Sequence, residues 1–132
     1  YMQENVLIFS GLFGMLQPLT LIPNYKLKMN VLSLQHHWRP ILSEALNKEK
    51  FIIDLLPQVH RKAYTPHKDV LRVDFSVINK GKKVAAGHFG KAVKGQFIKY
   101  LAENTITSKK DFNGFEYDGF KWNGAQFIKE QN

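Results

Sequence analysis

The sequence predicts an α+β fold, a single compact domain over residues 1–132 in which helices pack on a mixed sheet with hairpins. Short apolar runs bounded by turn residues predict the strands, and two of the turns have the composition of hairpin turns. Between these runs, apolar residues recur every three to four positions, which is typical of amphipathic helices. A chain of this length buries about two-thirds of its unfolded surface, so it needs no disulfide to hold a core.

The first elements expected along the chain are a strand, a short helix and an irregular segment. Val6–Phe9 is an apolar run typical of a buried strand. Ser10 can cap a short helix that extends to Leu16, because Pro18 stops a helix soon afterwards. Residues 19–34 alternate turn residues with isolated apolar residues and are expected to be irregular.

The middle of the chain is expected to form a helix followed by a strand. Trp38–Leu46 places its apolar residues on one helical face, and Pro40 falls in the first turn, where a proline is tolerated. Phe51–Leu56 is rich in strand-forming residues and ends at Pro57. These two segments therefore predict a helix packed near a strand.

A hairpin and a helix form the clearest unit of the sequence. Val70–Ile78 alternates apolar and polar residues, Asn79-Lys80-Gly81 supplies a turn, and Lys82–Phe89 returns as the second strand. Lys91–Asn104 has apolar residues at positions i, i+4, i+7 and i+8, which predicts an amphipathic helix that packs along one face.

A second hairpin is expected at the end of the chain. Phe120–Trp122 forms its first strand, Asn123-Gly124 its turn and residues 125–129 its second strand. Asn-Gly between two such runs is the strongest short hairpin signal, because both residues accept a positive φ. Strands and helices are interspersed without a strict β-α-β rhythm, so a mixed sheet is expected.

Composition excludes several classes of site. The chain has no cysteine, which excludes a disulfide framework, a thiolate metal site and a cysteine nucleophile. The five histidines show no metal-ligand spacing, so neither a metal nor a cofactor is expected. No apolar run approaches the roughly 18 residues of a membrane helix, so no membrane partner is expected.

The net charge of +8 is concentrated in one stretch of the chain. Residues 76–110 contain eight lysines and a single acidic residue, Glu103. Such a concentration is what a polyanion-binding face would show, although a solvated lysine-rich surface without a partner has the same composition. The lysines expected to contact phosphate groups are Lys80, Lys82, Lys83, Lys91 and Lys94.

An alternative site centres on Asp54, which interrupts an apolar run. A carboxylate there either faces solvent or is buried with a partner, which His60, Arg61 or Lys62 could supply after the turn at Pro57. A buried Asp–His pair would be a candidate general base, whereas a buried ion pair would be structural. The alternative function is therefore an enzyme or small-ligand-binding protein with a cleft near Asp54, His60 and Lys62, and no catalytic residue is assigned.

The sequence also resembles a known family. Ser10–Leu19 and Tyr25–Met29 are similar to the signature S-G-L-[YF]-G-x-L-[RQ]-P-L-D-x-I-x-x-Y-[RK]-L-E-M-G of the YaaA peroxide-stress proteins. Later landmarks follow in the family's order, namely Trp38 with Leu46-Asn47, Ile52–Leu55, Lys91–Gly95, Phe97–Asn104, Asn113–Phe115 and Gly119-Phe120. The resemblance spans nearly the whole chain and corresponds to about the C-terminal half of a family member. We therefore expect these residues to be the C-terminal portion of a longer chain.

The resemblance implies a cytoplasmic bacterial protein with a basic cleft, associated with resistance to hydrogen peroxide, with limiting reactive iron and with binding of double-stranded DNA. It adds Lys26 to the basic residues, beside Lys91 and Lys94. The chain departs from the family at polar positions, with Thr20 in place of Asp and Asp54 in place of Asn. We therefore predict a peroxide-stress protein that binds double-stranded DNA or another polyanion without sequence preference, and we leave its oligomeric state open.

Overall fold

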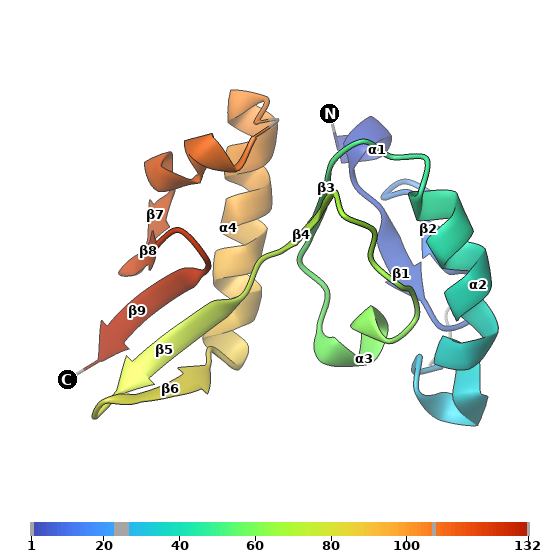
Figure 1. The fold of residues 1–132 in the computed structure, drawn as a ribbon, viewed down its shortest axis with the longest axis horizontal. Coiled ribbons are helices and arrows are strands. Elements are labelled where there is room, and N and C mark those ends of the chain that lie inside the picture. The colour runs from blue at the N-terminus through green and yellow to red at the C-terminus, as the bar shows by residue number, and fades with distance from the viewer. Residues whose placement is uncertain (1, 23–26, 107, 132) are drawn as a thin grey trace. The chain divides into compact units, whose positions relative to one another are not determined.

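The computed structural model describes residues 2–22, 27–106 and 108–131. Helices and mixed sheets together make an α+β fold, which confirms the predicted class (Figure 1). The chain forms two compact units, unit 1 from Tyr1 to Leu71 and unit 2 from Arg72 to Asn132. Each unit has sheets and buried side chains of its own, and the single domain over residues 1–132 stays a prediction.

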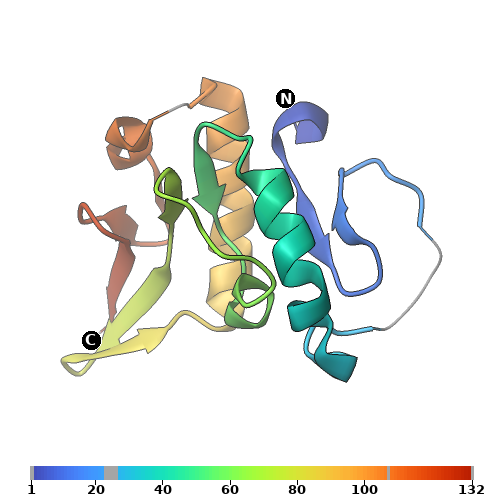
Figure 2. The ribbon, with the colours of Figure 1, turned by 45° about the vertical axis from the view of Figure 1, so that its right-hand side comes forward.

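Unit 1 combines a long helix with two sheets of two strands each. Its elements in chain order are α1 (Met2–Asn5), β1 (Ile8–Ser10), β2 (Gly14–Leu16), the 3-10 helix η1 (Val31–Ser33), α2 (Leu34–Leu46), β3 (Ile52–Asp54), α3 (Gln58–Arg61) and β4 (Val70–Arg72). Its buried core consists of Phe9, Met29, Leu42, Leu46, Ala63 and Tyr64. In Figure 2, the β1–β2 hairpin lies beside α2.

The helix expected between Ser10 and Leu16 is wrong, because this segment forms the β1–β2 hairpin. Ser10 does act as a cap, but its Oγ accepts a hydrogen bond from the Phe13 amide at 3.1 Å and so closes a turn. Gly14 then takes a φ of +81°, which reverses the chain, and a Cβ at this position would lie 2.8 Å from the Trp38 ring. The turn and this close approach of Trp38 determine the local structure.

The helix expected at Trp38–Leu46 is confirmed, but α2 begins four residues earlier, at Leu34. Pro40 therefore lies inside the helix, where it cannot donate the usual backbone hydrogen bond. Side-chain packing keeps the helix intact around it, since Leu42 is buried and the Trp38 indole N–H donates to the Gly11 carbonyl at 2.9 Å. Tertiary contacts thus override the local preference of proline.

Both strands expected in the middle of the chain are shorter than predicted. The strand expected at Phe51–Leu56 is present as β3, over Ile52–Asp54. The run Val70–Ile78 forms two strands, because β4 pairs with β3 whereas β5 (Phe75–Asn79) belongs to the sheet of unit 2. The chain changes its hydrogen-bonding partner between them, where the Asp74 carbonyl accepts from the Phe127 amide at 2.9 Å.

Unit 2 is a five-stranded sheet with a long helix against it (Figure 1). The strand order is β6-β5-β9-β8-β7, with β5 and β9 parallel and the other pairs antiparallel, so the sheet is mixed as predicted. The elements that follow β5 are β6 (Lys82–Ala85), α4 (His88–Asn104), the 3-10 helix η2 (Lys109–Gly114), β7 (Glu116–Tyr117), β8 (Phe120–Trp122) and β9 (Phe127–Gln131).

The predicted amphipathic helix is confirmed as α4, which begins three residues before the expected start. Val93, Phe97 and Leu101 are buried, in agreement with the periodic apolar face. The Phe97 ring lies 6.0 Å from Phe75 and 5.0 Å from Phe127, measured between ring centroids. This aromatic cluster holds α4 against the face of the sheet that carries Phe75.

The hairpin predicted around Asn79-Lys80-Gly81 is confirmed, although its second strand, expected over Lys82–Phe89, ends at Ala85. Asn79 pairs with Lys82, which leaves Lys80 and Gly81 as a two-residue turn. Their φ values are +52° and +78°, and this pair of positive angles matches the twist of the flanking strands. The turn therefore places Lys80 at the tip of a tight two-stranded ribbon.

The second predicted hairpin is present as β8–β9, but its loop has four residues. Trp122 pairs with Phe127, and the Asn123 carboxamide oxygen accepts hydrogen bonds from the amides of Ala125 and Gln126 at 2.9 Å. The β7–β8 hairpin was not predicted, although its turn is an Asp-Gly pair, a recognised hairpin signal.

Candidate nucleic-acid interface

Five lysines of the expected interface lie in unit 2, and we call them the lysine group. Its members are Lys80 in the hairpin turn, Lys82 and Lys83 on β6, and Lys91 and Lys94 on α4. Lys94 is half-buried and the other four are exposed. Lys26, the sixth expected residue, lies outside the described residues.

The register of the hairpin places Lys82 and Lys83 on opposite faces. Lys82 pairs with Asn79, which shares a face with Phe75, and that face packs against α4. Lys83 pairs with Ile78 and therefore projects from the other face. The lysines of the hairpin therefore lie on both faces of the sheet and not on a single face.

The helical members of the group lie close to the start of α4. Lys91 is in the first turn of the helix, and Lys94 follows three residues later, on the same side. Figure 1 shows the N-terminal end of α4 beside β6, the strand that precedes it. Lys82, Lys91 and Lys94 therefore belong to adjacent elements on the helix side of the sheet.

Four members of the lysine group differ in their surroundings from three other lysines of unit 2. Among the residues that the structure describes, Lys80, Lys82, Lys83 and Lys91 form no ion pair with a carboxylate. Three ion pairs occupy other lysines of the unit, namely Lys99 with Glu103 at 3.8 Å, Lys121 with Glu116 at 3.8 Å and Lys129 with Asp118 at 3.2 Å. The positive charge of Lys80, Lys82, Lys83 and Lys91 is therefore available to an anionic partner.

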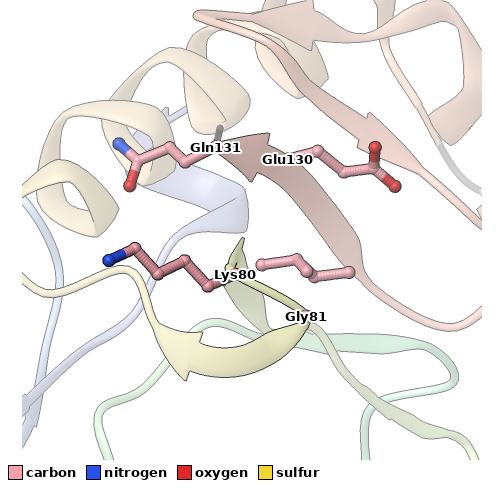
Figure 3. Close-up of a pocket in the computed structure, with 5 residues that line it drawn as sticks. Lys80, Gly81, Glu130 and Gln131 are labelled. Carbon is pink, nitrogen blue, oxygen red and sulfur yellow. The ribbon is translucent and has the colours of Figure 1, made fainter.

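An open hollow of 320 Å³ lies at the base of the hairpin turn, lined by Ile78, Lys80, Gly81, Glu130 and Gln131. In Figure 3, the side chains of Lys80 and Gln131 extend toward the same side, while the Glu130 carboxylate points away from them. An ammonium group and a carboxamide are both donors that contact phosphate oxygens in protein–DNA interfaces. The hollow thus adds Gln131, which the sequence did not single out, to the candidate interface.

The alternative site at Asp54 is a buried structural network. The Asp54 side chain is 1% exposed, and its Oδ1 accepts from the Leu56 amide at 2.8 Å and from the Arg61 Nε at 3.4 Å. The Tyr64 hydroxyl donates to the other carboxylate oxygen. Of the partners considered from the sequence, Arg61 thus forms the ion pair, and this favours the structural interpretation over a general base.

The other two residues of that alternative differ in their surroundings. His60 is half-buried, and its burial lowers the pKa of the imidazole below its usual value. Lys62 is exposed, and its carbonyl accepts a hydrogen bond from the Arg39 Nε at 2.9 Å. Tyr64, which holds Asp54, was missed because no motif links residues ten positions apart across a turn.

The structure was also searched for metal-binding groups and for membrane-spanning helices. The described part of the chain contains no group of three or more His, Asp or Glu residues placed to hold a metal ion. Within the same residues, none of the helices has both the length and the apolar character required to span a membrane.

Fold and site together define a basic α+β chain in which four exposed lysines of unit 2, Lys80, Lys82, Lys83 and Lys91, form no ion pair with a described carboxylate. A family model described as peroxide stress protein YaaA matches residues 1–126, and the chain belongs to this family. The resemblance seen in the sequence motifs is thereby confirmed.

Several curated bacterial proteins are similar in sequence to this chain. A UPF0246 protein of Flavobacterium johnsoniae is 30% identical over 135 residues, which cover 92% of this chain and 54% of the relative. A UPF0246 protein of Rickettsia rickettsii is 29% identical over 91% of this chain and 54% of the relative, and one of Lactobacillus helveticus is 27% identical over 89% and 52%. The chain thus spans about half the length of these curated relatives.

Proposed function

We propose that this chain acts in the response to peroxide stress by binding double-stranded DNA through the lysine group, without sequence preference. The family supports the stress-related role. One observation carries the binding proposal: the exposed lysines of the β5–β6 hairpin and of the first turn of α4 lack carboxylate partners among the described residues. Cytoplasmic location follows from this proposal, because bacterial DNA lies in the cytoplasm.

The chemistry of lysine supports contact with phosphates and not with base edges. An ammonium group is a point charge that releases counterions when it neutralises a phosphate, and this contribution is independent of sequence. Arginine, the residue that most often reads guanine, is absent from the lysine group. Affinity is therefore expected to be similar for unrelated sequences and to fall steeply with salt.

The position of the hairpin in the sheet suggests how a duplex is approached. Because β9 pairs with β5 as far as Asn79, the open parts of the hairpin are its turn and the outer strand β6. Lys80 in the turn and Lys82 and Lys83 on β6 would then approach phosphates along this edge of the sheet. Lys91 and Lys94 would extend the contact along the helix side.

The test is a binding titration with a charge-reversed variant. The substitutions Lys82→Glu and Lys91→Glu remove two phosphate contacts, so the slope of log K against log salt should decrease by about two and the affinity at low salt by at least about tenfold. Fluorescence anisotropy with two unrelated duplexes at several salt concentrations measures both quantities. The two duplexes should bind the unmodified chain equally.

The matched control reverses two exposed lysines of unit 1, Lys48→Glu and Lys50→Glu, and changes the net charge by the same amount. This control should lower the affinity much less, and its slope should stay close to that of the unmodified chain. Equal losses in the two variants would show that only the net charge matters. Undetectable binding by the unmodified chain at low salt would reject the proposal outright.

A further inference from the structure

The outer strand of the unit 2 sheet, β6, has a long side that no other strand covers. β6 is the last strand in the order β6-β5-β9-β8-β7, and among the described residues it pairs with β5 alone (Figure 1). All four of its residues, Lys82–Ala85, are exposed. We call this side of β6 the β6 edge.

The register of the hairpin shows which backbone groups the β6 edge presents. The Ala86 amide donates to the Phe75 carbonyl at 3.2 Å, and hydrogen-bonded pairs alternate with non-bonded pairs along an antiparallel ladder. Lys83 and Ala85 fall in the non-bonded pairs, so their amide and carbonyl groups point away from β5. Unpaired groups of this kind accept a further strand by main-chain hydrogen bonds.

The side chains along the β6 edge combine one apolar residue with two positive charges. Val84 is 48% exposed, and it shares the helix side of the sheet with Lys82. Lys83 projects from the opposite side, and neither lysine forms an ion pair with a described carboxylate. An added strand would therefore meet an apolar side chain at one end of β6 and a positive charge on each face at the other.

This distribution of charge decides which kind of strand fits. Pairing of β6 with β6 of a second copy would bring Lys82 and Lys83 of the two copies together on neighbouring strands, and like charges across a strand pair are destabilising. Lysines on an edge strand thus prevent self-association. The same lysines stabilise a neighbouring strand that carries carboxylates, because opposite charges across a strand pair attract each other.

We propose that the β6 edge binds an extended acidic segment of a partner protein as an added antiparallel strand. In the antiparallel direction the segment meets Val84 first, then Lys83 and then Lys82, so its recognised pattern is a β-branched apolar residue followed by two acidic residues. Main-chain hydrogen bonds to Lys83 and Ala85 hold the segment in place. Because Lys82 and Lys83 also belong to the lysine group, such a segment competes with duplex DNA for them.

The test uses the fluorescently labelled peptide acetyl-Thr-Val-Glu-Glu-Thr-amide and measures its anisotropy with the 132-residue chain in the absence of nucleic acid. In the proposed register the first glutamate lies opposite Lys83 and directs its amide toward β6, whereas the second lies opposite Lys82 and directs its amide away. Methylation of the first glutamate's amide nitrogen should therefore weaken binding at least about tenfold, and methylation of the second should change it less than about twofold. The two methylated peptides have the same charge and composition, so they form a matched pair.

A variant of the chain tests the contribution of charge. Lys82→Glu should weaken binding of the peptide at least about tenfold and restore it for a peptide in which the second glutamate is replaced by lysine. Lys48→Glu, at an exposed lysine of unit 1, changes the net charge equally and should leave binding almost unchanged. Circular dichroism reports whether both variants are folded.

Three outcomes would overturn the proposal. The first is that the unmodified chain does not bind the peptide, and if it still binds duplex DNA, the β6 edge is assigned to nucleic acid alone. The second is an equal loss from the two methylated peptides, which would show that charge and not strand pairing holds the peptide. The third is a dimer of the chain that Lys82→Glu leaves intact and that excludes the peptide, which would identify a second copy as the occupant.

Discussion

At the scale of single residues, Asp54 shows how a buried charge is accommodated. Its side chain and that of Arg61 are 1% and 5% exposed, and water therefore solvates neither group well. The Leu56 amide donates a further hydrogen bond to Oδ1 of Asp54, and the Tyr64 hydroxyl donates one to Oδ2. A buried ion pair that is also hydrogen-bonded is tolerated, whereas either partner alone would be strongly destabilising.

The first prediction concerns this network. Asp54→Ala leaves the Arg61 guanidinium buried without its counter-charge, so the free energy of unfolding should fall by about 3–5 kcal/mol. Tyr64→Phe removes one donor and should cost about 1–3 kcal/mol. Urea denaturation followed by circular dichroism measures both values. Asp69→Ala, at an exposed aspartate of the same unit, should change stability by less than about 0.5 kcal/mol; a loss as large as that of Asp54→Ala would contradict the argument.

At the scale of elements, two glycines show how a turn and a helix differ in the backbone conformation that they require. Gly81 has a φ of +78° in the β5–β6 turn and nothing within 4 Å of its Cβ position, so its requirement is conformational and not steric. Gly95 lies within α4, on the exposed side, with equally open space around it. The same substitution at these two positions therefore isolates the effect of backbone conformation.

The second prediction is that Gly→Ala has opposite signs at these positions. Gly81→Ala forces an alanine into a left-handed conformation and should destabilise the protein by about 1 kcal/mol. Gly95→Ala removes backbone freedom from the unfolded chain and should stabilise it by about 0.5–1 kcal/mol. Urea midpoints of the two variants give the comparison, and changes of the same sign would show that the hairpin turn or the helix is wrongly assigned.

At the scale of the whole molecule, the two units differ in how their strands are supported. In unit 2, β5 and β9 each have a hydrogen-bonded neighbour on both sides, and the aromatic cluster covers one face. In unit 1, the strands occur in pairs, and each described strand has one neighbour. Backbone amides in doubly paired, packed strands open less often than those in isolated pairs.

The third prediction is a gradient of hydrogen exchange along the chain. Amides of β5 and β9 should exchange at least about tenfold more slowly than those of β1 and β2. Their hydrogen bonds break only when the five-stranded sheet unfolds, whereas those of β1 and β2 break when a single strand pair opens. Mass spectrometry of peptides that cover each strand measures this directly. Comparable protection of β1 and β5 would contradict this difference between the two units.

Local signals by themselves determined the fold class, the amphipathic helix, the hairpin at residues 79–83 and the family, because periodicity, turn residues and short motifs act over a few neighbouring positions. They failed at residues 10–16, where the contact between Gly14 and Trp38 decides the conformation, and at the division of residues 70–78 into two strands with different partners. They also identified the lysine group but not its two-sided arrangement, nor the role of Tyr64 at Asp54. Strand register and side-chain burial depend on residues distant in the chain, so only the tertiary structure could decide them.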